Sequence, residues 1–192
     1  MPDKSMKPVM ILLLDRFADW ETAQISGIGA SFYGLDVRYV TPGGGNLRSM
    51  GGLPVTGLAD ATPHGDEVIV LCGGDSWLRD DAPDLGEMLR AAHDRGQTIA
   101  GICGATLALG RAGLLDGRAH TSNGLEFLQG HLSGYAAQAH YRDVPHAVAD
   151  GGIITAPGSA PVTFAAEVMR AAGLPADQVE GFVALASAEV MR

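Results

Sequence analysis

The stretch TIAGICGATLALGRAGLL, Thr98–Leu115, joins a β-type run directly to a helix-type run through a single cysteine, Cys103. The apolar residues before Cys103 indicate a short buried strand, and the small residues after it have the spacing of a helix. Gly101 and Gly104 lie on either side and allow a sharp backbone path. The join predicts a strand–turn–helix elbow in which Cys103 is either a nucleophile presented at the turn or a small apolar filler.

Short β-type runs alternate with longer helical runs along the rest of the chain. We expect strands over residues 8–14, 35–41, 67–72, 98–102 and 118–121, a short hairpin strand over 53–59 and a hairpin over 146–156. We expect a loop at 42–46 and helices over 20–34, 83–96, 104–112, 160–173 and 175–191, the last with an inner stripe of Val179, Phe182, Val183, Ala186 and Val190. This alternation predicts a doubly wound, mostly parallel α/β sheet in one domain that covers residues 1–192.

The composition limits which kinds of partner and cofactor we expect for this protein. The 192 residues include 22 acidic and 13 basic side chains and carry a net charge of −9, which argues against nucleic acid and anionic membranes as partners. The apolar run from Val9 to Leu14 is too short for a signal peptide or a membrane span, so we expect a cytoplasmic protein. Two cysteines, Cys72 and Cys103, cannot form a disulfide framework or a zinc site unaided, and we expect no metal and no cofactor.

Unusual residues follow three of the expected strands, where the sites of doubly wound sheets form. A helix N-terminus beside Cys103 would lower the pKa of the thiol from about 8.5 and would offer N–H donors to an oxyanion. Glu21, near the start of the first helix, is either part of such a site or an acid favoured by the helix dipole. The paired glycines Gly73 and Gly74 either expose N–H groups to an anion or form a plain turn.

The elbow segment GICGATLALGRAGLLDGRAHTSN at 101–123 resembles the ThiJ/PfpI superfamily, which is related to class I glutamine amidotransferases. FADWE at 17–21, GGD at 73–75 and TAPGSAPVTFAAEVM at 155–169 extend the resemblance nearly from end to end. The resemblance implies a flavodoxin-like sandwich that is usually a homodimer.

The resemblance also implies roles for individual residues. Cys103 would be the nucleophile, Glu21 the acid that hydrogen-bonds to its sulfur, and the N–H groups of Gly74 and Gly104 the oxyanion donors. Many members carry a histidine directly after the cysteine or in the strand after the elbow helix. Here those two positions hold Gly104 and Asn123. The Cys–His pair that amidase or peptidase chemistry needs is therefore missing from its usual positions, and neither glutamine hydrolysis nor peptidase activity is expected.

Three further residues are possible accessories of the site. Side chains alternate along a strand, so His120 should face away from Asn123 and be structural, and His140 should be a partly buried structural histidine. Cys72 stands where relatives commonly have proline, and its strand should neighbour the strand that ends at Ile102. Cys72 either fills a gap or condenses with a sulfenic acid on Cys103.

Three functions fit this pattern. The first is a cysteine-dependent enzyme that acts on a small carbonyl or amide substrate, either a hydrolase or an enzyme of the glyoxalase or deglycase type that the resemblance implies. The second is a redox-responsive stress protein in which Cys103 is oxidised and no substrate turns over. The third is a dimeric binding protein with an inert elbow.

Overall fold

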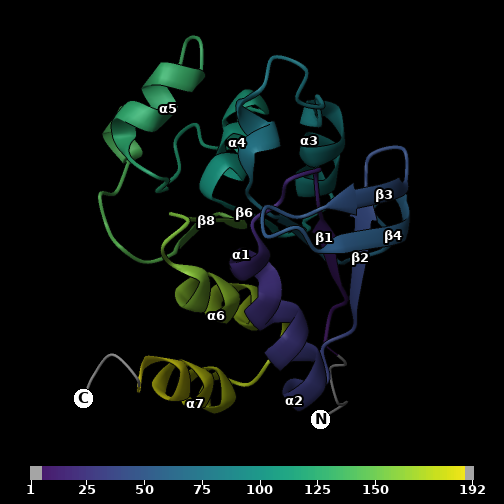
Figure 1. Cartoon of the computed structure of the whole chain (residues 1–192). Coiled ribbons are helices and arrows are strands. Elements are labelled where there is room, and N and C mark those ends of the chain that lie inside the picture. Colours follow the sequence, from purple (N-terminus) through teal and green to yellow (C-terminus); the bar gives the residue numbers. More distant parts are fainter. Residues whose placement is uncertain (1–5, 189–192) are drawn as a thin grey trace.

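The computed structural model describes residues 6–188, and the strands in this part of the chain form one eight-stranded sheet (Figure 1). The strands are β1 (Val9–Leu12), β2 (Val37–Thr41), β3 (Gly45–Arg48), β4 (Pro54–Asp60), β5 (Val68–Leu71), β6 (Ile99–Ile102), β7 (Val148–Asp150) and β8 (Ile153–Ala156). Their order is β3-β4-β2-β1-β5-β6-β8-β7, and only the edge pairs β3–β4 and β7–β8 are antiparallel. This confirms the predicted doubly wound α/β class.

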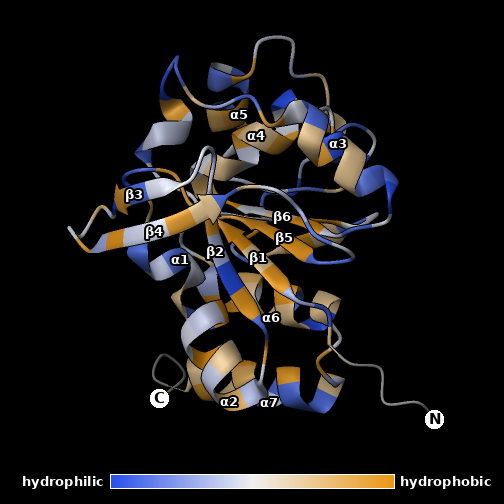
Figure 2. Ribbon diagram, turned by 90° about the vertical axis from the view of Figure 1, so that its right-hand side faces the viewer, coloured by the Kyte–Doolittle hydropathy of each residue, from blue (hydrophilic) through white to orange (hydrophobic). Residues whose placement is uncertain are grey.

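Helical segments cover both faces of the sheet (Figure 2). The α-helices are α1 (Asp19–Ala23), α2 (Ser31–Tyr33), α3 (Gly86–Asp94), α4 (Thr106–Arg111), α5 (Leu125–His131), α6 (Pro161–Ala172) and α7 (Ala176–Ser187). The π-helical segment η1 (Gln24–Ala30) joins α1 to α2, and the 3₁₀ segments are η2 (Asp75–Leu78), η3 (Cys103–Ala105) and η4 (Gln138–His140). The helices α1, α2, α6 and α7 lie on one face, and α3, α4 and α5 lie on the other.

The central strands are apolar at every position because both of their faces are covered. All four residues of β1 are buried, and they alternate between two cores. Val9 and Ile11 belong to the core that contains α6, whereas Met10 and Leu12 belong to the core that contains α3 and α4. Continuous apolar runs are typical of parallel strands sandwiched between helices. Within the described residues, no helix has the length and hydropathy needed to cross a membrane.

Residues 118–121 do not form the expected strand. The segment makes one isolated bridge, between His120 and Tyr141. Side chains take the place of a strand partner, because the N–H of Ala119 donates to Asp150 Oδ2 and the N–H of Thr121 donates to Thr155 Oγ1. The expected alternation of side chains along a strand therefore does not apply here.

Other boundaries differ from the expectation in smaller ways. The loop expected at 42–46 gives way at Gly45 to β3, which pairs with β4. The helix expected from Pro83 begins at Gly86, whose N–H donates to Asp84 Oδ1. In α7, Val179 and Phe182 are buried as the expected stripe requires, with Val183 and Ala186 partly buried against the same core; Val190 lies outside the described residues.

Candidate functional site

Cys103 occupies a strained elbow directly after β6. Its φ of +58° lies in the left-handed region, which costs a non-glycine residue on the order of 1–3 kcal/mol. β6 pairs with β5 on one side and β8 on the other, so the ends of three strands meet around the cysteine. Strained backbone of this kind is typical of nucleophiles presented at a strand–helix turn.

Glu21 extends from α1 into the space beside Cys103. Its side chain is fully buried, and Oε2 accepts a hydrogen bond of 2.7 Å from the N–H of Gly73, the second residue after β5. Oε1 has no hydrogen-bond partner among the described residues, and both Oε1 and Cys103 Sγ border the position of Gly158. The structure therefore brings Glu21 and Cys103 together, as the resemblance implies.

The pair has room because the loop after β8 carries a glycine. A Cβ atom at Gly158 would lie 3.0 Å from Cys103 Sγ and 3.1 Å from Glu21 Oε1. Any side chain at residue 158 would therefore press on both reactive groups. The sequence signal was present in the PGS turn after β8, since β8 neighbours β6 and ends at the same edge of the sheet.

Burial sets the acidity of both groups. It raises the pKa of Glu21 to about 7. It also raises the pKa of Cys103 to about 11, with the negative charge of Glu21 as the second cause. The expected lowering of the thiol pKa by the helix N-terminus is wrong, because burial and the neighbouring carboxylate outweigh the N–H of Gly104 that faces the sulfur. Near neutral pH, Glu21 is poised to exchange a proton with Cys103.

Asn123 supplies a donor to the sulfur. Its Nδ2 lies 3.2 Å from Cys103 Sγ, and its Oδ1 accepts a hydrogen bond of 2.9 Å from the N–H of Gly158. The orientation of the amide is assigned from this network, because the Gly158 N–H can only donate and so faces the oxygen. Asn123 therefore contacts the sulfur from the position where the resemblance places a histidine.

The surroundings of His120 favour the structural role predicted for it. It is fully buried, with Nδ1 2.7 Å from the carbonyl oxygen of Arg118 and Nε2 2.6 Å from the hydroxyl of Tyr135. A carbonyl can only accept, so Nδ1 carries the proton and Nε2 accepts from Tyr135. Burial lowers the pKa of His120, which favours this neutral form. His140 is exposed, so the expectation that its side chain is partly buried is wrong.

Cys72 directly follows β5, the strand that neighbours β6 as expected, but its thiol is buried away from solvent. It is fully buried, with Sγ 3.5 Å from the carbonyl oxygen of Ala18 and 3.8 Å from Thr22 Oγ1. Burial raises the pKa of the Cys72 thiol far above its usual range. The gap-filling interpretation therefore has more support than the redox interpretation.

Gly74 packs its backbone against the elbow. It forms an isolated antiparallel bridge with Phe17, and its φ of +153° and close contact with Arg16 leave no room for a side chain. Its carbonyl oxygen lies 2.9 Å from where a Cβ atom of Gly104 would be. The roles of the two N–H groups as oxyanion donors stay a prediction.

The family assignment follows from a match over most of the chain. Residues 7–171 match the family described as DJ-1/PfpI family. This chain belongs to the DJ-1/PfpI family. The assignment confirms the superfamily resemblance and the flavodoxin-like fold that it implies.

Solved structures and curated proteins of the DJ-1/PfpI family agree with the assignment. A DJ-1 superfamily protein from Agrobacterium tumefaciens is 40% identical, with a TM-score of 0.89, and the match covers 96% of this chain and 99% of that chain. A thiJ/pfpI family protein from Bacillus anthracis is 29% identical, with a TM-score of 0.84 and coverages of 95% and 92%. A Bacillus subtilis protein named uncharacterized protease YoaZ is 32% identical over 174 residues, which are 85% of this chain and 82% of that protein.

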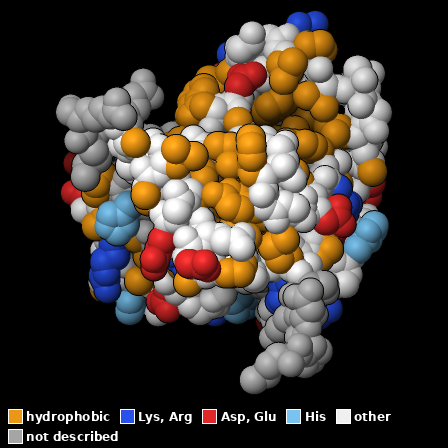
Figure 3. All heavy atoms as spheres, turned by 90° about the horizontal axis from the view of Figure 1, so that it is seen from below, with side chains coloured by type: hydrophobic (Ala, Val, Ile, Leu, Met, Phe, Trp, Pro, Cys, Tyr) orange, Lys and Arg blue, Asp and Glu red, His pale blue; other side chains and the backbone are white. Residues whose placement is uncertain are grey.

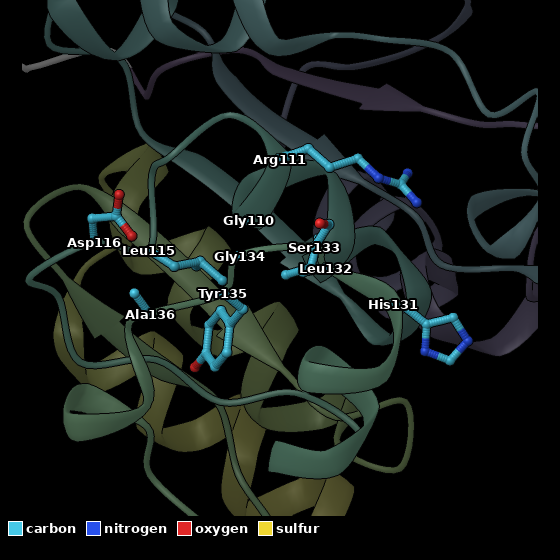
Figure 4. A pocket seen from close by; sticks show the side chains of 10 residues that line it. All are labelled: Gly110, Arg111, Leu115, Asp116, His131, Leu132, Ser133, Gly134, Tyr135 and Ala136. Carbon is cyan, nitrogen blue, oxygen red and sulfur yellow. The ribbon is translucent and has the colours of Figure 1, made fainter.

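Two cavities of this DJ-1/PfpI protein bear on the site, one beside the elbow helix and one beside Asn123. One, of about 440 Å³, is lined by α4 and residues 131–136, with Tyr135 and Arg111 at its walls (Figure 4), and none of the candidate site residues lines it. The other, of about 450 Å³, is lined by Asn123 together with Phe127, Tyr141 and Asp143. Asn123, which contacts the sulfur, lines this second cavity, whereas Cys103 and Glu21 do not. In the described part of the chain, no group of three or more His, Cys, Asp or Glu side chains could hold a metal ion.

Proposed function

We propose that this protein is a cysteine-dependent enzyme that adds the thiol of Cys103 to small reactive carbonyl compounds, such as α-oxoaldehydes. One observation carries the proposal: a buried carboxyl oxygen of Glu21 that accepts no hydrogen bond lies beside the sulfur at a strained elbow. An orphaned buried oxygen costs free energy in the resting protein. Such a cost is typical of a group retained for its chemistry rather than for stability.

The first step needs one proton carrier, and Glu21 can be that carrier. The sulfur forms a bond to the carbonyl carbon while its proton passes to Glu21, and the π electron pair of the carbonyl moves to the oxygen. Glu21 then gives the proton to that oxygen, which yields a neutral hemithioacetal and restores the carboxylate. A group with a pKa of about 7 is well matched to this transfer at neutral pH. The N–H groups of Gly74 and Gly104 are the proposed donors to the oxygen while it is charged.

Peptides and other amides fit the site less well. An amine leaving group needs a separate general acid, and both ring nitrogens of His120 are already engaged by Arg118 and Tyr135. We therefore propose weak activity on small aldehydes and little or none on peptides.

Replacing either candidate histidine should leave aldehyde turnover nearly intact. We expect His120→Ala and His140→Ala each to keep activity within about tenfold of the wild type, because loss of a general acid–base costs roughly 10²–10⁴. Initial rates with methylglyoxal, measured on variants whose folding is confirmed by circular dichroism, check this. A thousandfold loss in either folded variant would show that a histidine takes part.

The function itself is tested by offering the wild type methylglyoxal, p-nitrophenyl acetate and a peptide mixture in parallel. Steady turnover of methylglyoxal supports the proposal, and turnover of peptides overturns the carbonyl assignment. If no substrate turns over while mild peroxide adds oxygen mass to Cys103, the protein is a redox-responsive one. If neither occurs, the elbow is inert and a binding role remains.

We further propose a cytoplasmic homodimer, as the superfamily resemblance implies. Free thiols at Cys72 and Cys103 support a reducing compartment. Large apolar side chains are exposed on α2 and α7, where Phe32 is 80% and Leu185 74% accessible. Hydrophobic side chains gather on that lower face in Figure 3. Sedimentation equilibrium should give twice the chain mass of 19.9 kDa, and a mass of one chain at micromolar concentration would refute the dimer.

A further inference from the structure

We propose that Trp20 is a positioning residue for Cys103, acting through Gly158 and Asn123. The relevance to catalysis rests on the proposed function, but the hydrogen bonds themselves do not. The side chain of Trp20 reaches from α1 to the loop after β8, where its indole N–H donates to the carbonyl oxygen of Gly158 at 3.1 Å.

The contacts from the indole to the sulfur form a continuous series. The Gly158 carbonyl accepts from Trp20 at 3.1 Å, and the Gly158 N–H donates to Asn123 Oδ1 at 2.9 Å. Asn123 Nδ2 in turn donates to Cys103 Sγ at 3.2 Å. The peptide groups on both sides of Gly158 are therefore held, one by Trp20 and the other by Asn123. A shift of Gly158 would turn the amide that stabilises the thiolate.

The backbone at Gly158 needs a hydrogen bond from another element to hold its conformation, because this residue must be glycine. A side chain there would press on Cys103 Sγ and Glu21 Oε1, at 3.0 and 3.1 Å from its first carbon atom. Glycine leaves that space open to Cys103 and Glu21, but its backbone has the widest conformational freedom of any residue. A fixed donor on a neighbouring helix removes part of that freedom. Trp20 stays 50% exposed in reaching this loop, so the contact is not a by-product of core packing.

The residues on either side of Trp20 also form hydrogen bonds to the backbone of glycine-containing loops, as acceptors rather than donors. Asp19 Oδ2 accepts from the N–H of Gly51 at 2.8 Å, and Glu21 Oε2 accepts from the N–H of Gly73 at 2.7 Å. Three consecutive side chains of α1 thus each hold a different loop. Of these, the bond made by Trp20 is the one that continues through Asn123 to the sulfur.

The rate of Cys103 alkylation by iodoacetamide as a function of pH tests the inference without requiring turnover. Trp20→Phe keeps an aromatic ring but removes the N–H donor. We expect it to lower the alkylation rate at pH 8 by about threefold to tenfold and to raise the apparent thiol pKa, the size expected when one hydrogen bond is lost. Asn123→Ala should have an effect at least as large. The double variant should react no more slowly than Asn123→Ala alone, because both substitutions interrupt one series of contacts.

Ser26→Ala is the matched control. Ser26 lies in η1, directly after α1. The substitution removes a hydrogen bond of 3.2 Å to the carbonyl oxygen of Thr22, which does not belong to the series of contacts that reaches the sulfur, and should leave the alkylation profile unchanged. The inference is overturned if Trp20→Phe alkylates like the wild type, or if its effect multiplies with that of Asn123→Ala. A wild type without aldehyde turnover, combined with a shifted profile in Trp20→Phe, would refute the proposed function and leave the positioning role standing.

Discussion

Replacing Cys103 with serine abolishes aldehyde turnover, with an expected loss of more than about a thousandfold in kcat/KM. Serine is close to cysteine in size and fits the elbow, so the backbone and Glu21 stay in place. Its hydroxyl is far less acidic and less nucleophilic than the thiol. A carboxylate with a pKa of about 7 cannot deprotonate it to a useful extent. Initial rates with methylglyoxal, at concentrations around the KM of the wild type, measure the effect.

The second cysteine provides the control for this substitution. Cys72 is fully buried and its thiol pKa is raised far above the usual range, so limiting iodoacetamide should label Cys103 in the wild type and nothing in Cys103→Ser. Mass spectrometry of the intact chain and of its peptides distinguishes the two sites. If Cys72 is labelled first, or if Cys103→Ser retains its rate, Cys103 is not the nucleophile.

The elbow could be predicted from the sequence because its causes are local. A strand buried on both faces must be apolar throughout, and β6 is apolar from Ile99 to Ile102 before the small residues of α4 begin. The strand–turn–helix join then fixes where Cys103 lies. Parallel neighbours end at the same edge of the sheet, which is why the glycines after β5 could be expected beside it. The placement of Glu21 beside the sulfur comes from the family resemblance.

The contacts that orient the sulfur could not be predicted, because they join residues far apart in sequence. Trp20 and Gly158 are 138 residues apart, and Gly158 and Asn123 are 35 apart. The sequence predicts a strand over residues 118–121, just before Asn123. The N–H groups of Ala119 and Thr121 instead bond to the side chains of Asp150 and Thr155, which no local pattern indicates.

The sequence-based prediction of a lowered pKa for the Cys103 thiol is wrong in direction, and the reason is physical. A helix N-terminus lowers a thiol pKa most when the sulfur is exposed and the helix is long. Cys103 is partly buried, begins a 3₁₀ turn rather than a long helix, and lies beside a carboxylate. Burial and the charge of Glu21 therefore decide the pKa, and both depend on the tertiary structure.

Glu21→Gln should remove a pH dependence of stability from the protein. The pKa of Glu21 is about 7 when folded and 4.5 in the reference state, so both states hold the proton below pH 4.5 and the favourable contribution is complete there. Between pH 4.5 and 7 the folded state keeps a proton that the unfolded state has lost, so stability falls as pH rises. Above pH 7 the contribution is gone. The shift corresponds to roughly 3–4 kcal/mol, since each pKa unit is worth about 1.4 kcal/mol.

Urea unfolding at pH 5 and pH 8 measures this change in both proteins. The free energy of unfolding of the wild type should fall by roughly 2–3 kcal/mol more than that of Glu21→Gln over this interval, which covers most of the range between the two pKa values. His120 acts in the opposite direction, because its lowered pKa makes stability rise with pH, but it is present in both proteins and cancels in the difference. The variant should also lose aldehyde turnover by roughly 10²–10⁴, since glutamine cannot carry the proton. If the wild type and Glu21→Gln lose the same stability between pH 5 and pH 8, the Glu21 carboxyl titrates as an ordinary acid. The proton transfer assigned to Glu21 would then have no physical basis.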